Sequence, residues 1–432
     1  MYVLYISIIL ILGFALFEAP LFTIVAGLTI VCLYVMNHEW LSLQLIVIEM
    51  NRLASMPVLV ALPLFTFVGC LLTETKAPQR VMNFMQALFG WLPGGLAIAA
   101  ICSCAFFTAL TGASGITIVA LGAILYPILR QSLYHDRFSL GLITTSGSLG
   151  LLFPPSLPVI LYGVVNQIDI REFFKATLVP GILLVLVLSF YAFCHQIILA
   201  KNIRKAENCG KSVSWKGVKA AFWEGIWDWP IIVILILGIY GGFATIAEVS
   251  ALVLIYTILV ECFILREVSF VQKLPNIMIE SAVLSGAIIV ILGVALGFTG
   301  FLVDEKIPDL ILAGLSSLTQ NKYLFLAGLN VFLLAVGCIM DIFSAIVIVV
   351  PIIVPIALKY GIDPIHLGVI FLVNLEIGYS TPPVGINLFI SSIRFQKPIT
   401  LLYRASLPYL LIMLLFLVLI TYIPPLSLFF LR

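Results

Sequence analysis

The chain has 432 residues, of which 62% are hydrophobic and 10% are charged, and its formal net charge is +2. Soluble domains carry about 25% charged residues, so this composition excludes a soluble protein and predicts an all-α polytopic membrane protein. Four isolated histidines and eight scattered cysteines form no metal-ligand pattern. We therefore expect no enzyme and no organic cofactor, and the near-neutral charge gives no reason to expect a nucleic-acid partner.

The N-terminal part alternates apolar and mixed segments. Residues 2–17 have no basic start and no cleavage site, so we expect a retained helix rather than a signal peptide. Residues 20–36 form a second apolar segment, and residues 37–56 place charges at helical spacing, which predicts an amphipathic interfacial helix. A membrane span is expected over 57–73, followed by a short polar segment at 74–92.

The sequence TGASG at residues 111–115 separates two apolar arms. Neither arm is long enough to cross a bilayer of about 30 Å comfortably. The stretch 94–129 therefore predicts a re-entrant hairpin with its polar tip deep in the membrane. A second re-entrant hairpin is expected over 323–358, with its tip at Gly337–Asp341.

Two apolar stretches contain helix-breaking residues. The first, 138–167, includes Gly150 and the pair Pro154-Pro155. Proline lacks an amide donor and bars helical geometry at the residue before it. We therefore expect one transmembrane helix broken in its middle here and another over 366–393.

The remaining elements complete two similar halves. In chain order they are an amphipathic piece at 169–175, a span at 177–200, a basic linker at 201–229, a pinched apolar pair at 230–240 and 244–264, an amphipathic piece at 266–280, a span at 281–302, a polar piece at 303–322 and a final span at 405–431. The chain thus divides into a first repeat over 1–200, the linker 201–229 and a second repeat over 230–432.

Five residues recur after 228 positions without a gap. They are Pro127, Gly150, Pro154, Pro155 and Pro180, which match Pro355, Gly378, Pro382, Pro383 and Pro408. An unpaired backbone group costs several kcal/mol in lipid, so a helix breaks at membrane depth only where it lines a cavity or is covered by protein. One break in each half is a good indication of the binding site of a transporter.

The basic residues predict the orientation. If residues 201–219 are cytoplasmic, 15 of the 22 Lys and Arg lie inside, as the positive-inside rule requires. Both termini then face the periplasm, and the two hairpins enter the membrane from opposite sides. The predicted fold class is therefore an inverted-repeat transporter with two re-entrant helical hairpins and two broken transmembrane helices.

Asp341, at the second hairpin tip, is the strongest candidate for a functional residue, because an acid at the bilayer centre costs about 2.5–3.5 kcal/mol on insertion scales. An N-cap for the following helix is the alternative role, and both roles can coexist. Hard oxygen ligands at half-helix ends suit sodium. We predict one sodium site from Ser114, Gly147 and Gly150, and another from Gly337, Met340, Asp341, Gly378 and Thr381.

The same regions offer groups for an anionic substrate. The predicted substrate-binding residues are Thr111, Ser114, Ser156, Asp341 and Asn374. Glu376 and Ser380 take an equivalent place before the second break. The helices that restart after each break point the positive ends of their dipoles at the midplane, which suits an anion. For each Ser and Thr, the alternative is a hydrogen bond back to its own helix.

The sequence resembles the large membrane subunit of tripartite ATP-independent periplasmic (TRAP) transporters over nearly its whole length. The resemblance is carried by Leu62-Pro63-Leu64-Phe65, Gly94-Gly95-Leu96-Ala97, Thr111 to Gly115 with Gly122 and Pro127, Gly150 with Pro154-Pro155-Ser156 and Tyr162-Gly163, Asp341 with Pro351 and Pro355, Gly361 to Pro364, and Asn374 with Gly378 and Thr381 to Gly385. One departure is Ile116 after Ser114-Gly115, where the family commonly has another hydroxyl. Thr117 is the candidate replacement.

The resemblance implies an elevator-type secondary importer driven by Na⁺, in the bacterial inner membrane. Its substrates would be organic acid anions, such as C4-dicarboxylates, other carboxylates or sialic acids. The implied partners are a periplasmic substrate-binding protein and a small four-helix membrane subunit, which we expect to be a separate chain.

Three other functions compete with this interpretation. A stand-alone sodium:dicarboxylate symporter of the divalent-anion type uses two similar hairpins, but it commonly carries Ser-Asn-Thr at each tip, which neither tip has. An intramembrane enzyme acting on lipid-linked phosphates needs an acid/base set near one interface. A non-catalytic scaffold would not explain a repeated pair of helix breaks.

Overall fold

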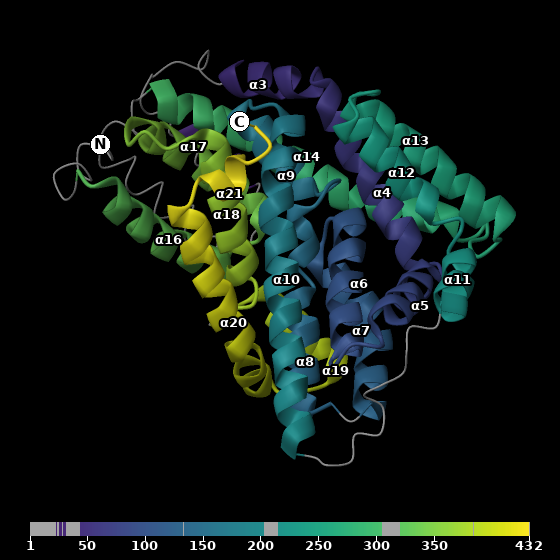
Figure 1. The fold of residues 1–432 in the computed structure, drawn as a ribbon. Coiled ribbons are helices and arrows are strands. Elements are labelled where there is room, and N and C mark those ends of the chain that lie inside the picture. The colour runs from purple at the N-terminus through teal and green to yellow at the C-terminus, as the bar shows by residue number, and fades with distance from the viewer. Residues whose placement is uncertain are drawn as a thin grey trace.

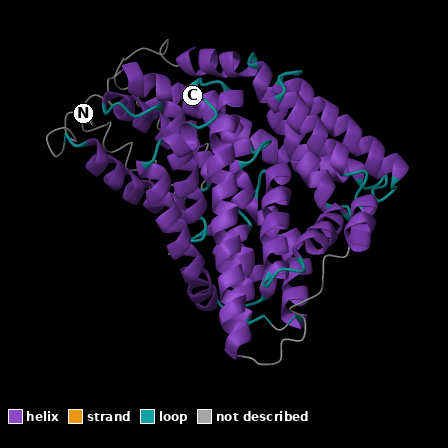
Figure 2. Cartoon of the chain, viewed as in Figure 1, coloured by secondary structure: helices purple, strands orange, loops and turns teal. Residues whose placement is uncertain are grey.

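The computed structural model describes residues 23, 26–27, 29–31, 44–132, 134–202, 215–304, 320–382 and 384–431. Every regular element in these residues is a helix (Figures 1 and 2). Within the described residues, seven helices are long and apolar enough to cross a membrane, and up to ten spans result if each of three bent pairs counts as one. The prediction of an all-helical, multi-pass membrane protein is confirmed.

The first half of the described chain is built from helices of 10 to 33 residues. They are α3 (Gln44–Ala54), α4 (Ala61–Thr73), α5 (Ala77–Phe89), α6 (Gly95–Thr111), α7 (Ser114–Gln131), α8 (Asp136–Ser146), α9 (Leu157–Asn166) and α10 (Ile170–Asn202). A 3₁₀ turn at Pro57–Val60 precedes α4. The predicted N-terminal helices over 2–17 and 20–36 lie almost entirely outside the described residues.

The second half follows after residues 203–214, the part of the basic linker outside the described residues. Its helices are α11 (Trp215–Glu224), α12 (Trp229–Leu235), α13 (Ile246–Ile258), α14 (Leu274–Asp304), α16 (Lys322–Ile339), α17 (Ile342–Lys359), α18 (Pro364–Gly378), α19 (Ile386–Phe395), α20 (Ile399–Tyr422) and α21 (Pro425–Leu428). Short π-helical turns extend α12 to Tyr240 and α13 to Ile264. Most of the predicted polar piece 303–322 lies outside the described residues.

The two helical arms of each predicted hairpin form, and their re-entry into the membrane stays a prediction. In the first, α6 and α7 are joined by two residues, and Gly112 takes a left-handed backbone with φ of +67°. A Cβ at Gly112 would lie 2.6 Å from the Leu157 side chain, so glycine is required for space as well as for conformation. In the second hairpin, α16 runs on to Ile339 before the turn to α17, so Gly337 lies inside the arm and not in the turn.

Both predicted breaks are also present. The first helix stops at Ser146, makes a 3₁₀ turn over Leu149–Leu152 (η3) and restarts at Leu157 with a bend of 44°. The second stops at Gly378 and restarts at Ile386. Pro154-Pro155 and Pro382 lie in these gaps, as their missing amide donors predict. Pro383 lies outside the described residues.

The order and bounds of the helices follow the 228-residue offset. Adding 228 to the bounds of α7 gives 342–359, which are the bounds of α17. The offset likewise carries α6 to 323–339, within α16, and α8 to 364–374, within α18. The repeat seen in sequence therefore has a counterpart in the helix pattern. The relative orientation of the two copies to the membrane, and hence their inversion, stays a prediction.

Three predicted segment boundaries differ from the structure. The predicted segments 169–175 and 177–200 belong to one continuous helix, α10, apart from residue 169, because no glycine or proline separates them. The predicted boundary between 266–280 and 281–302 likewise falls inside α14. Residues 74–92, expected to be a short polar segment, contain the amphipathic helix α5.

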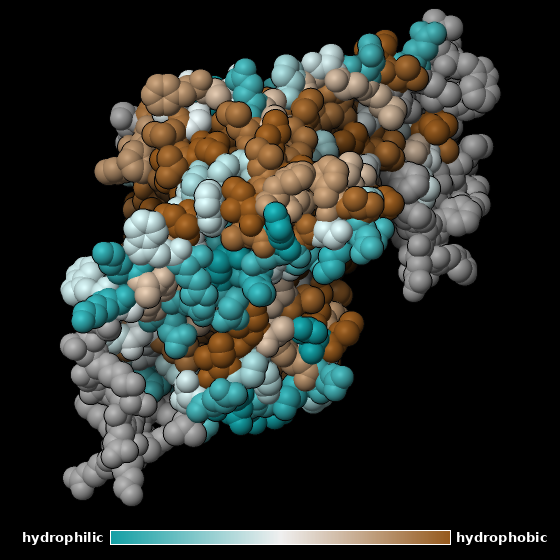
Figure 3. All heavy atoms as spheres, turned by 90° about the vertical axis from the view of Figure 1, so that its right-hand side faces the viewer, coloured by the Kyte–Doolittle hydropathy of each residue, from teal (hydrophilic) through white to brown (hydrophobic). Residues whose placement is uncertain are grey.

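The surface matches a membrane environment. Figure 3 looks onto the right-hand side of Figure 1 and shows a broad hydrophobic area above a hydrophilic one. Helix α13 lies on that side of Figure 1. Its residues Leu252 and Ile255 are exposed, and so is Leu259 in the π-helical turn that extends it. Since positions three and four apart share one face of a helix, these side chains form an apolar stripe of the kind that lipid tails cover.

Candidate functional site

The first hairpin tip and the first break meet through hydroxyl groups. Thr108 Oγ1 lies 2.8 Å from Thr117 Oγ1 and donates to the Gly147 carbonyl oxygen at 2.8 Å. Both threonines are fully buried. The contact joins α6, α7 and the end of α8, so the structure brings together the tip and the break that were predicted to form one sodium site.

A close backbone approach joins tip to break in each half. A Cβ at Gly150 would lie 2.3 Å from the amide nitrogen of Ala109, and a Cβ at Gly378 would lie 2.5 Å from the carbonyl carbon of Gly337. Subtracting 228 from Gly378 and Gly337 gives positions 150 and 109. Equivalent positions of the two repeats therefore make the same contact. The contact requires glycine at position 150 and at position 378, because a Cβ there would overlap the hairpin arm.

The two halves touch each other at the first tip. Ser114 Oγ donates to Asn387 Oδ1 at 2.7 Å, which joins the start of α7 to the start of α19. A second hydrogen bond between the halves joins α8 to α19, where Thr144 donates to Ser391 at 2.8 Å. All four side chains are buried. The first hairpin and both broken helices thus form one packed unit.

Asp341 caps α17. Its carboxylate accepts from the Ser344 amide at 3.0 Å and from the Ser344 hydroxyl. Tyr379, just after α18, accepts from the Ile342 amide at 2.5 Å. The Gly385 amide donates to the Cys338 carbonyl oxygen at 3.2 Å, so the second tip also adjoins the second break. The capping role is therefore present, and Met340 is the half-buried residue immediately before it.

The other predicted residues make mainly local bonds. Ser156 Oγ donates to the Leu151 carbonyl oxygen at 2.5 Å, and Thr381 Oγ1 donates to that of Ile377 at 2.8 Å. Thr111 Oγ1 lies 3.4 Å from Thr117 Oγ1. Asn374 donates to the Ile370 carbonyl oxygen and to Asn330 of α16, both at 2.8 Å. Asn374 therefore faces α16, on the side of α18 that also carries Gly378.

Several buried polar atoms near the second break have no hydrogen-bond partner among the residues that the structure describes. They are Asn374 Oδ1, both carboxylate oxygens of Glu376, Ser380 Oγ and Asn387 Nδ2. All four residues are fully buried. Buried polar groups in proteins are nearly always paired, with protein, water or a ligand. This region therefore has unfilled capacity to bind a polar ligand.

Sequence reasoning missed Asn387 and Thr108. Asn387 is the second residue of α19, and its repeat counterpart is Val159. Its signal was an amide in an apolar segment directly after the Thr381 to Gly385 motif. Thr108 stood inside an apolar arm, where a hydroxyl is ordinarily explained by a bond to its own helix.

A large cavity borders the first break and has the wrong chemistry for an anion. It has a volume of about 560 Å³ and lies between α6, the first break, α10 and α12. Its wall includes Phe106, Phe153, Leu178, Ile232 and Leu235. An organic acid needs hydrogen-bond donors or positive charge, which these side chains do not provide.

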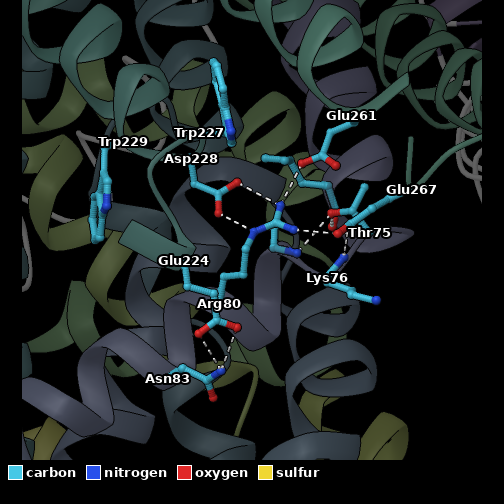
Figure 4. A network of polar contacts seen from close by, with 12 residues as sticks. Thr75, Lys76, Arg80, Asn83, Glu224, Trp227, Asp228, Trp229, Glu261 and Glu267 are labelled. Atoms are coloured by element: carbon cyan, nitrogen blue, oxygen red, sulfur yellow. Dashed lines mark hydrogen bonds and ion pairs between the residues drawn. The ribbon is translucent and has the colours of Figure 1, made fainter. Parts of the chain in front are cut away.

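A buried charge network ties the two halves together at α5 (Figure 4). Arg80 pairs with Asp228 at 2.7 Å, with Glu267 at 2.8 Å and with Glu261 at 2.9 Å. In the predicted orientation, Arg80 is one of the basic residues on the cytoplasmic side of the membrane. The structure gives it a further role, because it anchors α5 to the chain before α12 and after α13. Sequence reasoning had no signal for these pairings, whose partners lie 148 to 187 residues away.

The fold and the paired breaks define a membrane protein of the broken-helix type found in secondary transporters. The family model for the DctM component of tripartite ATP-independent periplasmic transporters matches residues 8–426. The chain therefore belongs to this family and is a TRAP transporter large permease. The stand-alone symporter alternative gains no support from this match.

Two curated relatives show the extent of the similarity. The C4-dicarboxylate TRAP transporter large permease protein of Pseudomonas aeruginosa is 35% identical over 90% of this chain and 89% of its own length. The isethionate TRAP transporter permease protein DctMQ of Oleidesulfovibrio alaskensis is 35% identical over 89% of this chain. The chain spans 59% of the length of that second relative.

One solved structure has a similar fold. The YdaH transporter of Alcanivorax borkumensis superposes with a TM-score of 0.60, covering 89% of this chain and 87% of its own. The sequences are 14% identical. The likeness supports the arrangement of the helices and carries no information about substrate.

Proposed function

We propose that this chain is the transport subunit of a sodium-driven importer of organic acid anions. It would receive its substrate from a periplasmic binding protein and work with a small four-helix membrane subunit in the bacterial inner membrane. The substrate class includes C4-dicarboxylates, other carboxylates and sialic acids. Two relatives are named for C4-dicarboxylate and isethionate, and both of these compounds are organic acid anions.

The observation that carries the proposal is the meeting of each hairpin tip with a helix break. Gly147, Gly150 and Ser114 lie around the first meeting point, and Gly378 and Asp341 lie around the second. Carbonyl oxygens at half-helix ends and the Asp341 carboxylate are ligands that sodium accepts. We assign one coupling ion to each meeting point, with Met340, Gly337 and Thr381 completing the second.

The anion would bind where the two halves touch. Asn387 Nδ2 is a buried donor without a partner, and it lies in the first turn of α19. The positive end of the α19 dipole lies at that turn and favours negative charge. Ser114 donates to the side-chain oxygen of Asn387, which leaves the side-chain Nδ2 to donate to an acid group of the substrate. Thr111, Ser156 and Asn374 would form the surrounding wall.

The movement would be of the elevator type. Ser114 to Asn387 and Thr144 to Ser391 join the first hairpin and the two broken helices. A unit packed in this way would move as one body past the remaining helices. The Arg80 network, which fixes α5 to residues 228–267, would belong to the stationary part.

Reconstituted uptake tests the proposal. The full chain with its small subunit is placed in proteoliposomes, and uptake of labelled succinate is measured with and without the binding protein. A sodium gradient is then replaced by a potassium gradient at fixed pH and membrane potential. We expect uptake only with sodium and the binding protein. Equal uptake in potassium would overturn sodium coupling, and full uptake without the binding protein would favour a stand-alone symporter.

A further inference from the structure

The apolar cavity between α6, the first break, α10 and α12 has no role in the proposed transport chemistry. Its volume is about 560 Å³, which lies within the range of about 300–1,000 Å³ found for ligand pockets. The helices that enclose it stand in the middle and to the right of Figure 1. Even a cavity of about 150 Å³ with apolar walls stays dry and binds apolar molecules. The walls of this cavity therefore favour a hydrocarbon over water.

The cavity opens toward the surface that lipid covers. Ile236 of α12 lines the cavity and is 52% exposed. On α10, Leu178 and Val185 line the cavity, and the exposed Ile182 lies four residues after the first and three before the second. These three side chains share one face of the helix. A hydrocarbon chain that lies against α10 and α12 can therefore enter the cavity without passing a polar group.

A lysine lies where the headgroup of such a lipid would lie. Lys175 is three residues before Leu178 and seven before Ile182, so it lies on the same side of α10, about two turns nearer the start of the helix than Ile182. Its side chain is half-buried. Lysines near the ends of membrane helices extend their charged groups to the headgroup region. Lys175 thus complements the phosphate group of a phospholipid whose acyl chain extends toward Ile182.

The same end of the cavity is closed by contacts within the protein. The Tyr240 hydroxyl donates to the Phe174 carbonyl oxygen at 3.5 Å, and Arg171 donates to the Ala244 carbonyl oxygen at 2.8 Å. These bonds join the start of α10 to the end of the α12 segment and the loop after it. A lipid chain therefore enters from the side, between α10 and α12. Since Arg171 is bonded to the loop, we assign the phosphate to Lys175.

We propose that this cavity binds one acyl chain of a membrane phospholipid, and that the phosphate group of this lipid pairs with Lys175. The chemistry of the walls selects the acyl chain, and the lysine beside the opening selects the headgroup. The site includes no predicted sodium or substrate ligand, so the inference does not rest on the proposed transport function.

Photo-cross-linking in a membrane tests the proposal. The full chain with its partner subunits is placed in vesicles of phosphatidylethanolamine and phosphatidylglycerol, and a small share of the phosphatidylethanolamine carries a diazirine on its acyl chain. Cross-linked peptides are identified by mass spectrometry. We expect cross-links on wall residues that lipid at the outer surface does not reach, such as Ala109 and Leu110, which are each 6% exposed. Their absence from the wild type, as expected if a partner helix covers the cavity, would overturn the proposal.

Matched variants separate the cavity from the outer lipid surface. Val185→Trp places a large side chain in the cavity, whereas Val187→Trp adds the same side chain at an exposed position of α10 that does not line it. We expect the first variant to lose most cross-links at Ala109 and Leu110 and the second to keep them. Ile232→Phe, which fills the cavity from α12, serves if Val185→Trp does not fold. Equal cross-linking in the filled and control variants would overturn the site.

Lys175→Gln tests the contact with the phosphate. Losing one hydrogen bond to a charged group lowers affinity about tenfold. The concentration of diazirine lipid that gives half-maximal cross-linking in detergent micelles should therefore rise about tenfold. Lys273→Gln is the matched control, because Lys273 is an exposed lysine just before α14 that does not line the cavity, and it should behave as the wild type. An unchanged concentration in Lys175→Gln would overturn the assignment of the phosphate.

Discussion

The two helix breaks share one backbone design and differ in their side chains. In both halves a glycine of the broken helix touches the hairpin arm at repeat-related positions, Gly150 against Ala109 and Gly378 against Gly337. In the first break, the Ser148 and Ser156 hydroxyls are bonded to nearby carbonyl groups. In the second, buried atoms of Glu376, Ser380 and Asn387 are left without partners.

The two repeats therefore share the backbone geometry of their breaks, but they differ in the polar side chains that could bind a ligand. The backbone contact is needed twice because each tip must reach its break. The unfilled polar capacity belongs to the second break, which also lies beside the hairpin tip that carries Asp341. The repeat counterpart of Asp341 is Ala113, which starts α7 without a side-chain cap. We therefore expect substitutions at the second break to affect ion and substrate binding most strongly, and those at the first break to have smaller effects on transport.

The largest expected effect is at Asp341. Asp341→Asn keeps the capping ability, since Asn caps a helix about as well as Asp, but removes the charge. We expect Asn and Ala variants both to abolish sodium-driven uptake, and only Ala to lose about 1 kcal/mol of stability. Asp363→Asn is the matched control, because Asp363 caps α18 by accepting from the Ile365 and His366 amides. Near wild-type uptake by Asp341→Asn would leave Asp341 with a capping role alone.

The next effect tests the shared backbone contact. Gly150→Ala and Gly378→Ala each place a Cβ within 2.5 Å of hairpin backbone. The backbones of the broken helix and the hairpin arm must move apart, which lowers the free energy of unfolding by about 1–3 kcal/mol. Thermal unfolding in detergent would measure this loss of stability. Gly286→Ala in α14 is the control, since nothing lies within 4 Å of its Cβ. If the two site variants are as stable as the control, the two breaks do not share this contact.

A smaller effect is expected at Asn387, where the two halves meet. Removing a hydrogen bond to a charged group costs about 1.5–3 kcal/mol, and each 1.4 kcal/mol is a factor of ten in affinity. Asn387→Ala should therefore raise the KM for succinate at least tenfold while sodium dependence persists. Val159→Ala, at the repeat counterpart, should leave KM unchanged. A similar KM for both variants would remove the anion site from the second break.

The smallest effect is expected at Ser156, in the first break. Ser156→Ala removes the bond to the Leu151 carbonyl oxygen, and a bond of this kind contributes about 1 kcal/mol. Thermal unfolding should show a modest loss of stability. Uptake should keep its sodium dependence, and its KM should rise far less than in Asn387→Ala, because Ser156 only borders the anion. A strong rise in KM would show that the first break also binds substrate, and the contrast between the two halves would fail.

Much of the fold could be predicted from the sequence because its signals are local. Proline pairs and glycines in apolar stretches mark both breaks, and the offset of 228 relates helices that the structure also relates. The boundaries inside α10 and α14 were wrong because charge patterning changes there without any residue that ends a helix. A change of polarity alone does not stop a helix.

The site was only partly predictable. Gly147, Gly150, Gly337 and Gly378 were identified because they lie at the predicted breaks and hairpin tips, where backbone carbonyl oxygens can bind an ion. The partners of those residues were not, because contacts such as Ser114 to Asn387 join positions 273 residues apart. Arg80 illustrates the same limit, since its three carboxylate partners come from the other half of the chain. Such pairings depend on packing, which composition and spacing do not encode.

The most direct test of the second break as an ion site is the stabilisation of the purified chain by sodium. A ligand that binds only the folded state raises stability in proportion to the logarithm of its concentration. The thermal unfolding midpoint is measured in increasing NaCl, with KCl holding the ionic strength constant, for the wild type, Asp341→Asn and Asp363→Asn. We predict that sodium raises the midpoint of the wild type and of Asp363→Asn by equal amounts, and that of Asp341→Asn by less, because this variant keeps only the site at the first meeting point. An equal sodium response in all three proteins would contradict the assignment of a coupling ion to the second break.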